Sequence, residues 1–181
     1  IRAAGALAAA RAERALPPFI GLRVKSLEPA TRRRGVRTLD LFLGALLADA
    51  PLPDGFVVTF PKVMAVEQVA ALVEICQRLE AAYRLPAGRL RFELQIETPQ
   101  SVLSAAGLVT VAQLVHASAG RCVGLHYGTY DYSAALGVAA GFQSMEHPAA
   151  DQAKALMQIA AAGTGVRLSV SGSGRPSGPE S

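Results

Sequence analysis

The chain has 181 residues, of which 51% are hydrophobic and 18% are charged, enough for one buried core of ordinary domain size. Its two cysteines exclude a disulfide-rich framework, so we expect buried thiols in a reducing cytoplasm. No apolar run approaches the roughly 20 residues that cross a bilayer, so no membrane partner is expected. The net charge of +4, carried mostly by arginine, favours small anionic partners; the arginines at 32–34 lack neighbouring aromatics, so nucleic acid is not expected.

Strand-like and helix-like segments alternate along the chain. Residues 2–16 are Ala-rich with spaced charges and predict a helix that ends at Pro17-Pro18. Short apolar runs predict five strands, at 19–24, 55–60, 90–96, 122–128 and 166–168. Apolar residues at helical spacing follow the first four strands, at 39–47, 66–79, 111–115 and 149–162.

This alternation predicts an α/β fold with a parallel sheet, because strands that recur every roughly 30–40 residues with helices between them form right-handed βαβ crossovers. A doubly wound open sheet and a (β/α)₈ barrel both satisfy the pattern. A barrel usually needs about 250 residues and eight βα units, so five strands would make only part of one. Length alone therefore favours the open sheet.

Polar or charged residues stand at the C-terminal ends of the predicted strands. Arg23 and Lys25 end the first strand, Lys62 follows the second, Glu97 ends the third and Asp131 follows the fourth. In parallel α/β folds ligands bind at this edge, so we expect these side chains to converge. Two carboxylates suit Mg²⁺, which commonly takes one or two of them and keeps several waters, while the cations would bind a 2-oxo or 2-hydroxy acid.

Each of these residues also has a purely structural interpretation. Glu97 precedes Thr98 and could cap a helix or face its dipole, and Asp131 could cap the next helix. Arg23 could pair with a structural carboxylate, and Lys62 could be solvated. If both acids are only caps, the protein binds no metal.

Several other chemistries are not expected from the motifs. No Gly-rich phosphate loop and no Ser-centred nucleophile elbow is present, which argues against nucleotide hydrolysis and serine hydrolase chemistry. The histidines, His116, His126 and His147, have no metal-ligand spacing with one another or with a cysteine.

Four strand-end segments carry a family resemblance: Leu22-Arg23-Val24-Lys25, Phe60-Pro61-Lys62-Val63, Ile96-Glu97-Thr98-Pro99 and Gly128-Thr129-Tyr130-Asp131-Tyr132. Together they resemble the aldolase/citrate lyase family of the phosphoenolpyruvate/pyruvate barrel superfamily, which includes the citrate lyase beta subunit, malyl-CoA lyase and hydroxy-oxo-acid aldolases. The likeness spans most of residues 17–168. Lys25 stands where the family usually has Asn, and the last segment also resembles malate synthase.

The resemblance implies a partial (β/α)₈ TIM barrel of about five of eight βα units. It also implies Mg²⁺, or alternatively Mn²⁺, on Glu97 and Asp131, with Arg23 at the substrate and Arg23, Glu97 and Asp131 as the catalytic set. Lys25 and Lys62 would complete the substrate-binding group. The implied enzyme is a cytoplasmic carbon–carbon lyase or aldolase, a homo-oligomer when full length, which acts on a 2-oxo or hydroxy acid or its CoA thioester through a metal-stabilised enolate.

Two further alternatives stay open at this level. A phosphoenolpyruvate-handling phosphotransferase or mutase would use the same superfamily barrel, and a truncated barrel could be inactive. The chain begins at Ile1 rather than Met, so we expect residues upstream of it. The expected domains are a partial barrel at 1–168 and a disordered Gly/Ser/Pro tail at 169–181, with a frameshift or truncation near Ser169 as our hypothesis for the abrupt change.

Overall fold

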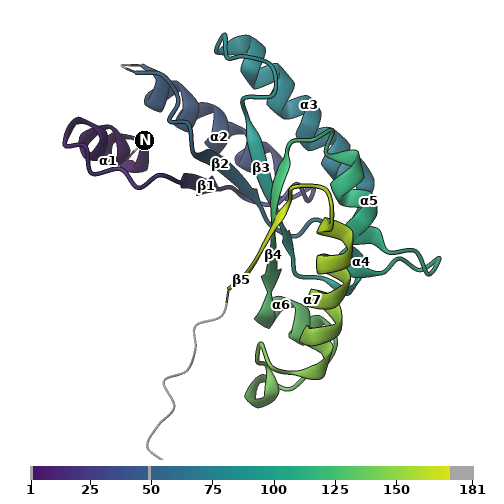
Figure 1. The fold of residues 1–181 in the computed structure, drawn as a ribbon. Coiled ribbons are helices and arrows are strands. Elements are labelled where there is room, and N and C mark those ends of the chain that lie inside the picture. The colour runs from purple at the N-terminus through teal and green to yellow at the C-terminus, as the bar shows by residue number, and fades with distance from the viewer. Residues whose placement is uncertain (1, 49, 172–181) are drawn as a thin grey trace, which may run out of the picture.

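The structure is a computed structural model that describes residues 2–48 and 50–171 (Figure 1). Its sheet is built from β1 (Ile20–Arg23), β2 (Phe56–Phe60), β3 (Arg91–Ile96), β4 (Cys122–Gly128) and β5 (Arg167–Ser171). Its helices are α1 (Arg2–Ala12), α2 (Arg32–Leu47), α3 (Val66–Ala82), α4 (Pro99–Val102), α5 (Thr110–Ala117), α6 (Thr129–Ala135), the 3₁₀ turn η1 (Ala140–Phe142) and α7 (Pro148–Ala161).

The order of the strands distinguishes between the two α/β architectures. Every strand is parallel to the next and lies beside it, in the order β1-β2-β3-β4-β5. A doubly wound sheet reverses its strand order at a switch point, whereas a barrel adds each strand to the same growing edge. The fold is therefore part of a (β/α)₈ barrel, and the open sheet that length alone favoured is wrong.

The two faces of the sheet differ in chemistry. Alternate residues of β2 and β3 are buried in one core with the helices: Phe56, Val58, Phe60, Phe92, Leu94 and Ile96. Figure 1 shows α3, α5 and α7 along this side of the sheet. The other face carries Thr59, Arg91 and Glu93 and borders a cavity of about 750 Å³. In a closed barrel this polar face would be the interior.

Some expected boundaries differ from the structure. The first helix ends at Ala12 instead of residue 16, because Arg14 adopts a left-handed φ of 57° and breaks the helical hydrogen bonding before the proline pair. The last strand continues to Ser171, so residues 169–171 belong to β5 and not to the expected tail. The rest of that tail, 172–181, lies outside the described residues. The short helices α4 and α6 and the turn η1 were not predicted.

A buried ion pair fastens the opposite, N-terminal edge of the strands. Arg121 donates hydrogen bonds to both carboxylate oxygens of Glu80, at 2.7 and 2.9 Å, and to the carbonyl of Leu90 at 3.0 Å. Burial raises the pKa of Glu80, but hydrogen bonds from Arg121 and from the Leu90 and Gly88 backbones outweigh it and hold that pKa below its usual range. The pair joins α3, β3 and β4 far from the strand ends at which ligands bind in barrels.

Among the described helices, none combines the length and the apolar character that crossing a bilayer requires.

Candidate metal centre

Glu97 is the first residue after β3, and its carboxylate is held inside the protein. The side chain is only 4% exposed, and its Oε1 accepts a hydrogen bond of 2.7 Å from the backbone N–H of Lys62. Lys62 itself has a φ of 54°, a left-handed conformation that costs about 1–2 kcal/mol for a residue other than glycine. The loop after β2 thus accepts strain at the point where it binds the Glu97 carboxylate.

Gly128, at the end of β4, leaves room for this carboxylate. Ile96 pairs with Tyr127, so the next residues along the two strands, Glu97 and Gly128, face each other. A Cβ placed on Gly128 would lie 2.5 Å from Cβ of Glu97 and 3.0 Å from its Oε2. No side chain fits there. Gly128 was not predicted as a site residue, although a glycine in a strand that precedes an acidic loop can signal such close approach.

Asp131 brings a second carboxylate to the same place. It is the third residue of α6, whose N-cap is Gly128, so Asp131 does not cap this helix. Burial is the main cause that raises the pKa of Glu97, and the charge and hydrogen bond of Asp131 raise it further, while the Lys62 backbone opposes the shift. The two acids therefore repel each other, and a cation between them would relieve the repulsion.

The helix that follows Glu97, α4, is capped by Thr98. Oγ1 of Thr98 accepts from the backbone N–H of Ser101 at 3.3 Å, and Oγ of Ser101 donates to the carbonyl of Thr98 at 2.6 Å. Pro99 is the first helical residue, where its missing N–H costs nothing. Thr98 thus performs the capping role considered for Glu97, and the Glu97 carboxylate is not used as a cap.

A buried amide lies on β3 two residues before Glu97. Gln95 is two residues before Glu97 and so lies on the same face of the strand. It is 8% exposed, and its Oε1 has no hydrogen-bond partner among the described residues. A buried oxygen without a partner normally costs about 1–3 kcal/mol, which suggests that a ligand completes its hydrogen bonding. Gln95 was not singled out from the sequence.

These donors fit a hard divalent ion of the Mg²⁺ type. Glu97 and Asp131 supply carboxylate oxygens that repel each other. In the part of the chain that the structure describes, no three or more His, Cys, Asp or Glu side chains gather as a metal cluster. A pair of carboxylates with open positions is the sparse ligand set that Mg²⁺ accepts and that a structural zinc site does not.

The three predicted cations do not share one position. Lys62 lies near enough to the carboxylate of Glu97 for its charge to lower that pKa, against the larger effect of burial. Arg23 is in register with Thr59 on β2 and lines the 750 Å³ cavity over the inner face of the sheet. Lys25 is exposed after β1. Within the described residues, no hydrogen bond or ion pair joins Arg23 or Lys25 to Glu97.

A chain of polar side chains crosses the inner face of the sheet. Oε2 of Glu93 accepts from Oγ1 of Thr59 at 3.2 Å and lies 2.5 Å from Nε2 of His126. The other ring nitrogen of His126 contacts the hydroxyl of Ser169. The hydrogen bond from His126 holds the pKa of Glu93 below its usual range. These four residues link β2, β3, β4 and β5, and the pairing of Glu93 with His126 was not predicted.

Parallel strands added in sequential order, with a carboxylate pair where β3 and β4 end, define the molecule as part of a (β/α)₈ barrel with a candidate metal site. The chain matches a family model described as "Domain of unknown function (DUF6986)" over residues 1–175, and it belongs to that family. No curated protein matches the sequence significantly.

Solved structures share this fold at low sequence identity. A citrate lyase from Burkholderia xenovorans LB400 aligns with a TM-score of 0.68 at 21% identity, over 92% of this chain and 48% of its own. The ternary complex of Haloferax volcanii malate synthase with pyruvate and acetyl-CoA aligns with a TM-score of 0.63 at 18% identity, over 84% and 40%. An HpcH/HpaI aldolase/citrate lyase family protein from Burkholderia cenocepacia J2315 aligns with a TM-score of 0.59 at 18% identity, over 93% of this chain and 65% of its own. The chain thus spans less than half of the first two.

Proposed function

We propose that the complete protein is a Mg²⁺-dependent carbon–carbon lyase or aldolase that acts on a 2-oxo or hydroxy acid or on its CoA thioester. The observation that carries this proposal is the pair of carboxylates, Glu97 and Asp131, where β3 and β4 end. Supporting it, one Haloferax volcanii malate synthase structure with this fold is a magnesium and glyoxylate complex, aligned with a TM-score of 0.65 at 18% identity over 85% of this chain. Mn²⁺ is the alternative ion.

Each residue near the site has a role in this proposal. Glu97 and Asp131 hold the ion, which when bound supplies the positive charge that stabilises an enolate. The Lys62 N–H fixes one oxygen of Glu97, so the carboxylate keeps its orientation. The orphaned carbonyl oxygen of Gln95 marks a buried amide available to position a substrate. Arg23 binds a substrate oxyanion or carboxylate from the inner face, and Lys62 and Lys25 contribute positive charge at the rim.

The chemistry proposed is reversible making and breaking of a carbon–carbon bond next to a carbonyl. The electrons of the broken bond pass onto the carbonyl oxygen of the fragment that becomes the enolate, and a proton later returns to its carbon. None of the predicted residues needs to form a Schiff base, so Lys62 acts through its charge and its backbone. A water or a residue outside this chain moves the proton.

Proton exchange tests this chemistry. The methyl protons of pyruvate, and separately of the acetyl group of acetyl-CoA, are followed by proton NMR in D₂O with Mg²⁺, with chelator, and with the Glu97→Gln variant. We expect exchange above the protein-free rate only with Mg²⁺ and the unchanged chain. Exchange that persists with chelator, or in Glu97→Gln, would contradict a metal-dependent enolate. Phosphoenolpyruvate turnover in place of exchange would move the assignment to the phosphotransferase alternative.

We also propose that the complete protein acts in the cytoplasm as a homo-oligomer. Both cysteines are buried free thiols, and burial raises the pKa of Cys76 and of Cys122 to about 12. Such thiols are chemically inert and suit a reducing compartment.

A further inference from the structure

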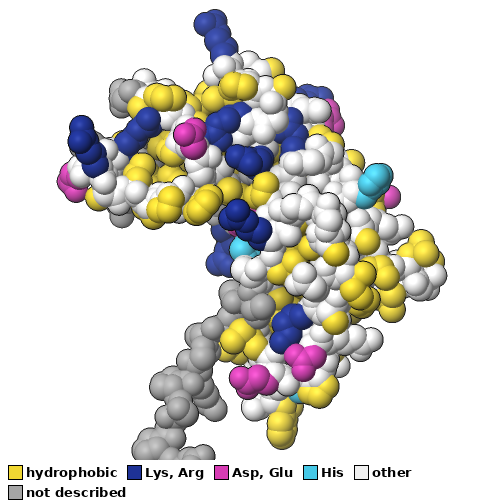
Figure 2. All heavy atoms as spheres, viewed as in Figure 1, with side chains coloured by type: hydrophobic (Ala, Val, Ile, Leu, Met, Phe, Trp, Pro, Cys, Tyr) yellow, Lys and Arg dark blue, Asp and Glu magenta, His cyan; other side chains and the backbone are white. Residues whose placement is uncertain are grey.

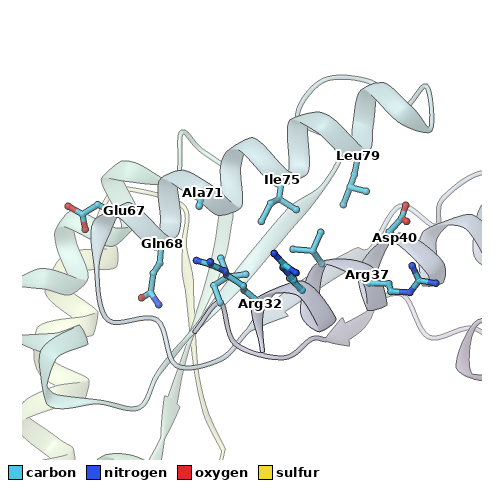
Figure 3. Close-up of a pocket in the computed structure, with 11 residues that line it drawn as sticks. Arg32, Arg37, Asp40, Glu67, Gln68, Ala71, Ile75 and Leu79 are labelled. Atoms are coloured by element: carbon cyan, nitrogen blue, oxygen red, sulfur yellow. The ribbon is translucent and has the colours of Figure 1, made fainter. Parts of the chain in front are cut away.

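The helices α2 and α3 follow neighbouring strands and meet where Tyr83, the C-cap of α3, hydrogen-bonds to Asp40 of α2. α2 packs chiefly against α1, and α3 packs against α5. The space between α2 and α3 is a groove of about 700 Å³. Figure 3 shows the two helices running side by side, with side chains from both directed into this groove.

One wall of the groove is apolar. Ala71, Ile75 and Leu79 follow one another at four-residue spacing along α3, and Val36 faces them from α2. Ala71 is exposed and Ile75 is half-buried, whereas Leu79 is buried, so the stripe is accessible to solvent at Ala71 and Ile75. The lining residues of α3 extend from 67 to 79, which gives the groove a length of about 18 Å at 1.5 Å per residue.

The α2 wall carries three arginines that make no ion pair with any described residue. Arg32, Arg33 and Arg37 line the groove and are exposed, and their guanidinium groups make no hydrogen bond or ion pair with any described residue. Figure 2 shows Lys and Arg side chains beside hydrophobic ones over this part of the molecule. The lining also holds two acids, Glu67 and Asp40, and Asp40 accepts a hydrogen bond of 2.8 Å from the hydroxyl of Tyr83. The three arginines outnumber these two acids, so the lining keeps a net positive charge. The groove therefore pairs an apolar stripe with free, fork-shaped cations that suit carboxylates.

The shape of the groove limits what can occupy it. A second copy of this chain cannot fill the groove with its own, because two concave surfaces leave a void between them. A small molecule would remain largely exposed in so accessible a channel, whereas ligand pockets bury most of their ligand. A helix is convex, reaches both walls over the full length and offers side chains at the same four-residue spacing.

We propose that this groove binds an amphipathic helix of a partner protein, whose apolar face packs on Ile75 and Val36 and whose acidic edge pairs with Arg32, Arg33 and Arg37. The groove lies on the helical outside of the partial barrel, and the proposal is independent of the metal chemistry. It assigns Arg32, Arg33 and Arg37 a binding role in place of a merely solvated helix face.

A selection experiment tests the proposal on the chain as it exists. A displayed library of helical peptides of about 14 residues, long enough to follow the groove, is selected on the unchanged protein and depleted on Ile75→Glu. We expect enriched peptides with apolar residues at i, i+4 and i+7 and with Asp or Glu along one edge. Their affinity should fall about 10-fold or more in Arg33→Glu and should weaken as salt is raised.

The matched control lies on the same helix. Arg34 is exposed and adjacent to Arg33 but does not line the groove, so Arg34→Glu should leave peptide binding unchanged. Thermal unfolding shows whether each variant is folded. If Ile75→Glu does not fold, the loss of peptide binding in Arg33→Glu still tests the proposal. Enrichment of basic peptides, equal loss of binding in both arginine variants, or no enrichment at all would overturn the proposal.

Discussion

Gly128 and Glu97 face each other across β3 and β4 so closely that a Cβ on the glycine would lie 2.5 Å from the Cβ of the glutamate. This approach explains why the strand that precedes Asp131 ends in glycine. It also allows the Glu97 carboxylate to reach both the Lys62 N–H and the neighbourhood of Asp131.

Gly128→Ala should therefore displace Glu97. We expect Mg²⁺ affinity to fall about 10-fold or more and stability to fall by about 1–3 kcal/mol, because the added methyl group has no space. Calorimetric titration and urea unfolding measure the two effects. Gly141→Ala is the matched control, since a Cβ there meets nothing within 4 Å. Unchanged metal affinity in Gly128→Ala would show that this contact does not shape the site.

The metal-free protein should lose stability at Glu97 as pH rises. Burial, reinforced by Asp131, raises the pKa of Glu97 above its ordinary value of 4.5, so the folded chain holds this proton more tightly than the unfolded chain does. The resulting stability is fully present below pH 4.5 and is lost as pH rises through the raised pKa.

Glu97→Gln should consequently raise the melting temperature at neutral pH while it removes metal binding. The amide carries no charge to bury, and its oxygen still accepts from Lys62. Thermal unfolding in chelator, compared between pH 5 and pH 8, measures the change. A variant that melts lower than the unchanged chain at pH 8 would contradict a raised pKa at this position.

Gln95→Met should weaken substrate binding more than metal binding. The change keeps the volume but removes the orphaned oxygen, so we expect pyruvate affinity to fall about 3- to 10-fold while Mg²⁺ affinity stays nearly the same. Calorimetry with each ligand separates the two. Gln100→Met alters an exposed glutamine nearby and serves as the control. Equal pyruvate binding in both variants would remove Gln95 from the site.

The buried ion pair of Arg121 and Glu80, at the N-terminal edge of the strands, should affect the stability of the protein but not its ligand binding. Arg121→Leu leaves Glu80 buried without its partner, which should cost about 3–5 kcal/mol in urea unfolding. The exposed pair of Arg78 and Glu74 provides the contrast, and Arg78→Ala should cost no more than about 0.5 kcal/mol.

The pH dependence of this pair has the opposite sign to that of Glu97. Folding lowers the pKa of Glu80 below its ordinary value of 4.5. The stability that the ionised carboxylate contributes is therefore fully present above pH 4.5 and is lost as pH falls through the lowered pKa. Equal losses for the Arg121 and Arg78 variants would contradict the role given to the buried pair.

The elements of the fold were predictable because their signals are local. Apolar runs and helical periodicity identify five strands and the main helices without knowledge of their neighbours. Which strand lies beside which is not encoded in periodicity, so periodicity and length left the open sheet and the barrel undecided; the family resemblance of the strand-end motifs implied the partial barrel, and the sequential strand order confirms it. α1 ends early because Arg14 adopts a left-handed conformation, which the residue types of this Ala-rich segment do not predict.

The same distinction holds for the site. Glu97, Asp131 and Lys62 come together as the strand-end rule predicts, because each follows a strand of one parallel sheet. The register of neighbouring strands is set by packing, and it places Arg23 of β1 beside Thr59 of β2, with β2 between Arg23 and the strand that carries Glu97. Gln95 carries no charge and stands inside a strand, so its importance is visible only in the structure, whereas the glycine at position 128, before an acidic loop, offered a sequence signal that went unused.

Calorimetric titration of Mg²⁺ and Mn²⁺ into this chain, compared with Glu97→Gln and Asp131→Asn, tests the central claim most directly. We expect one site per chain in the unchanged protein, with binding lost in both variants although both remain folded. Binding that survives in either variant, or its absence from a folded unchanged chain, would contradict a metal site at Glu97 and Asp131.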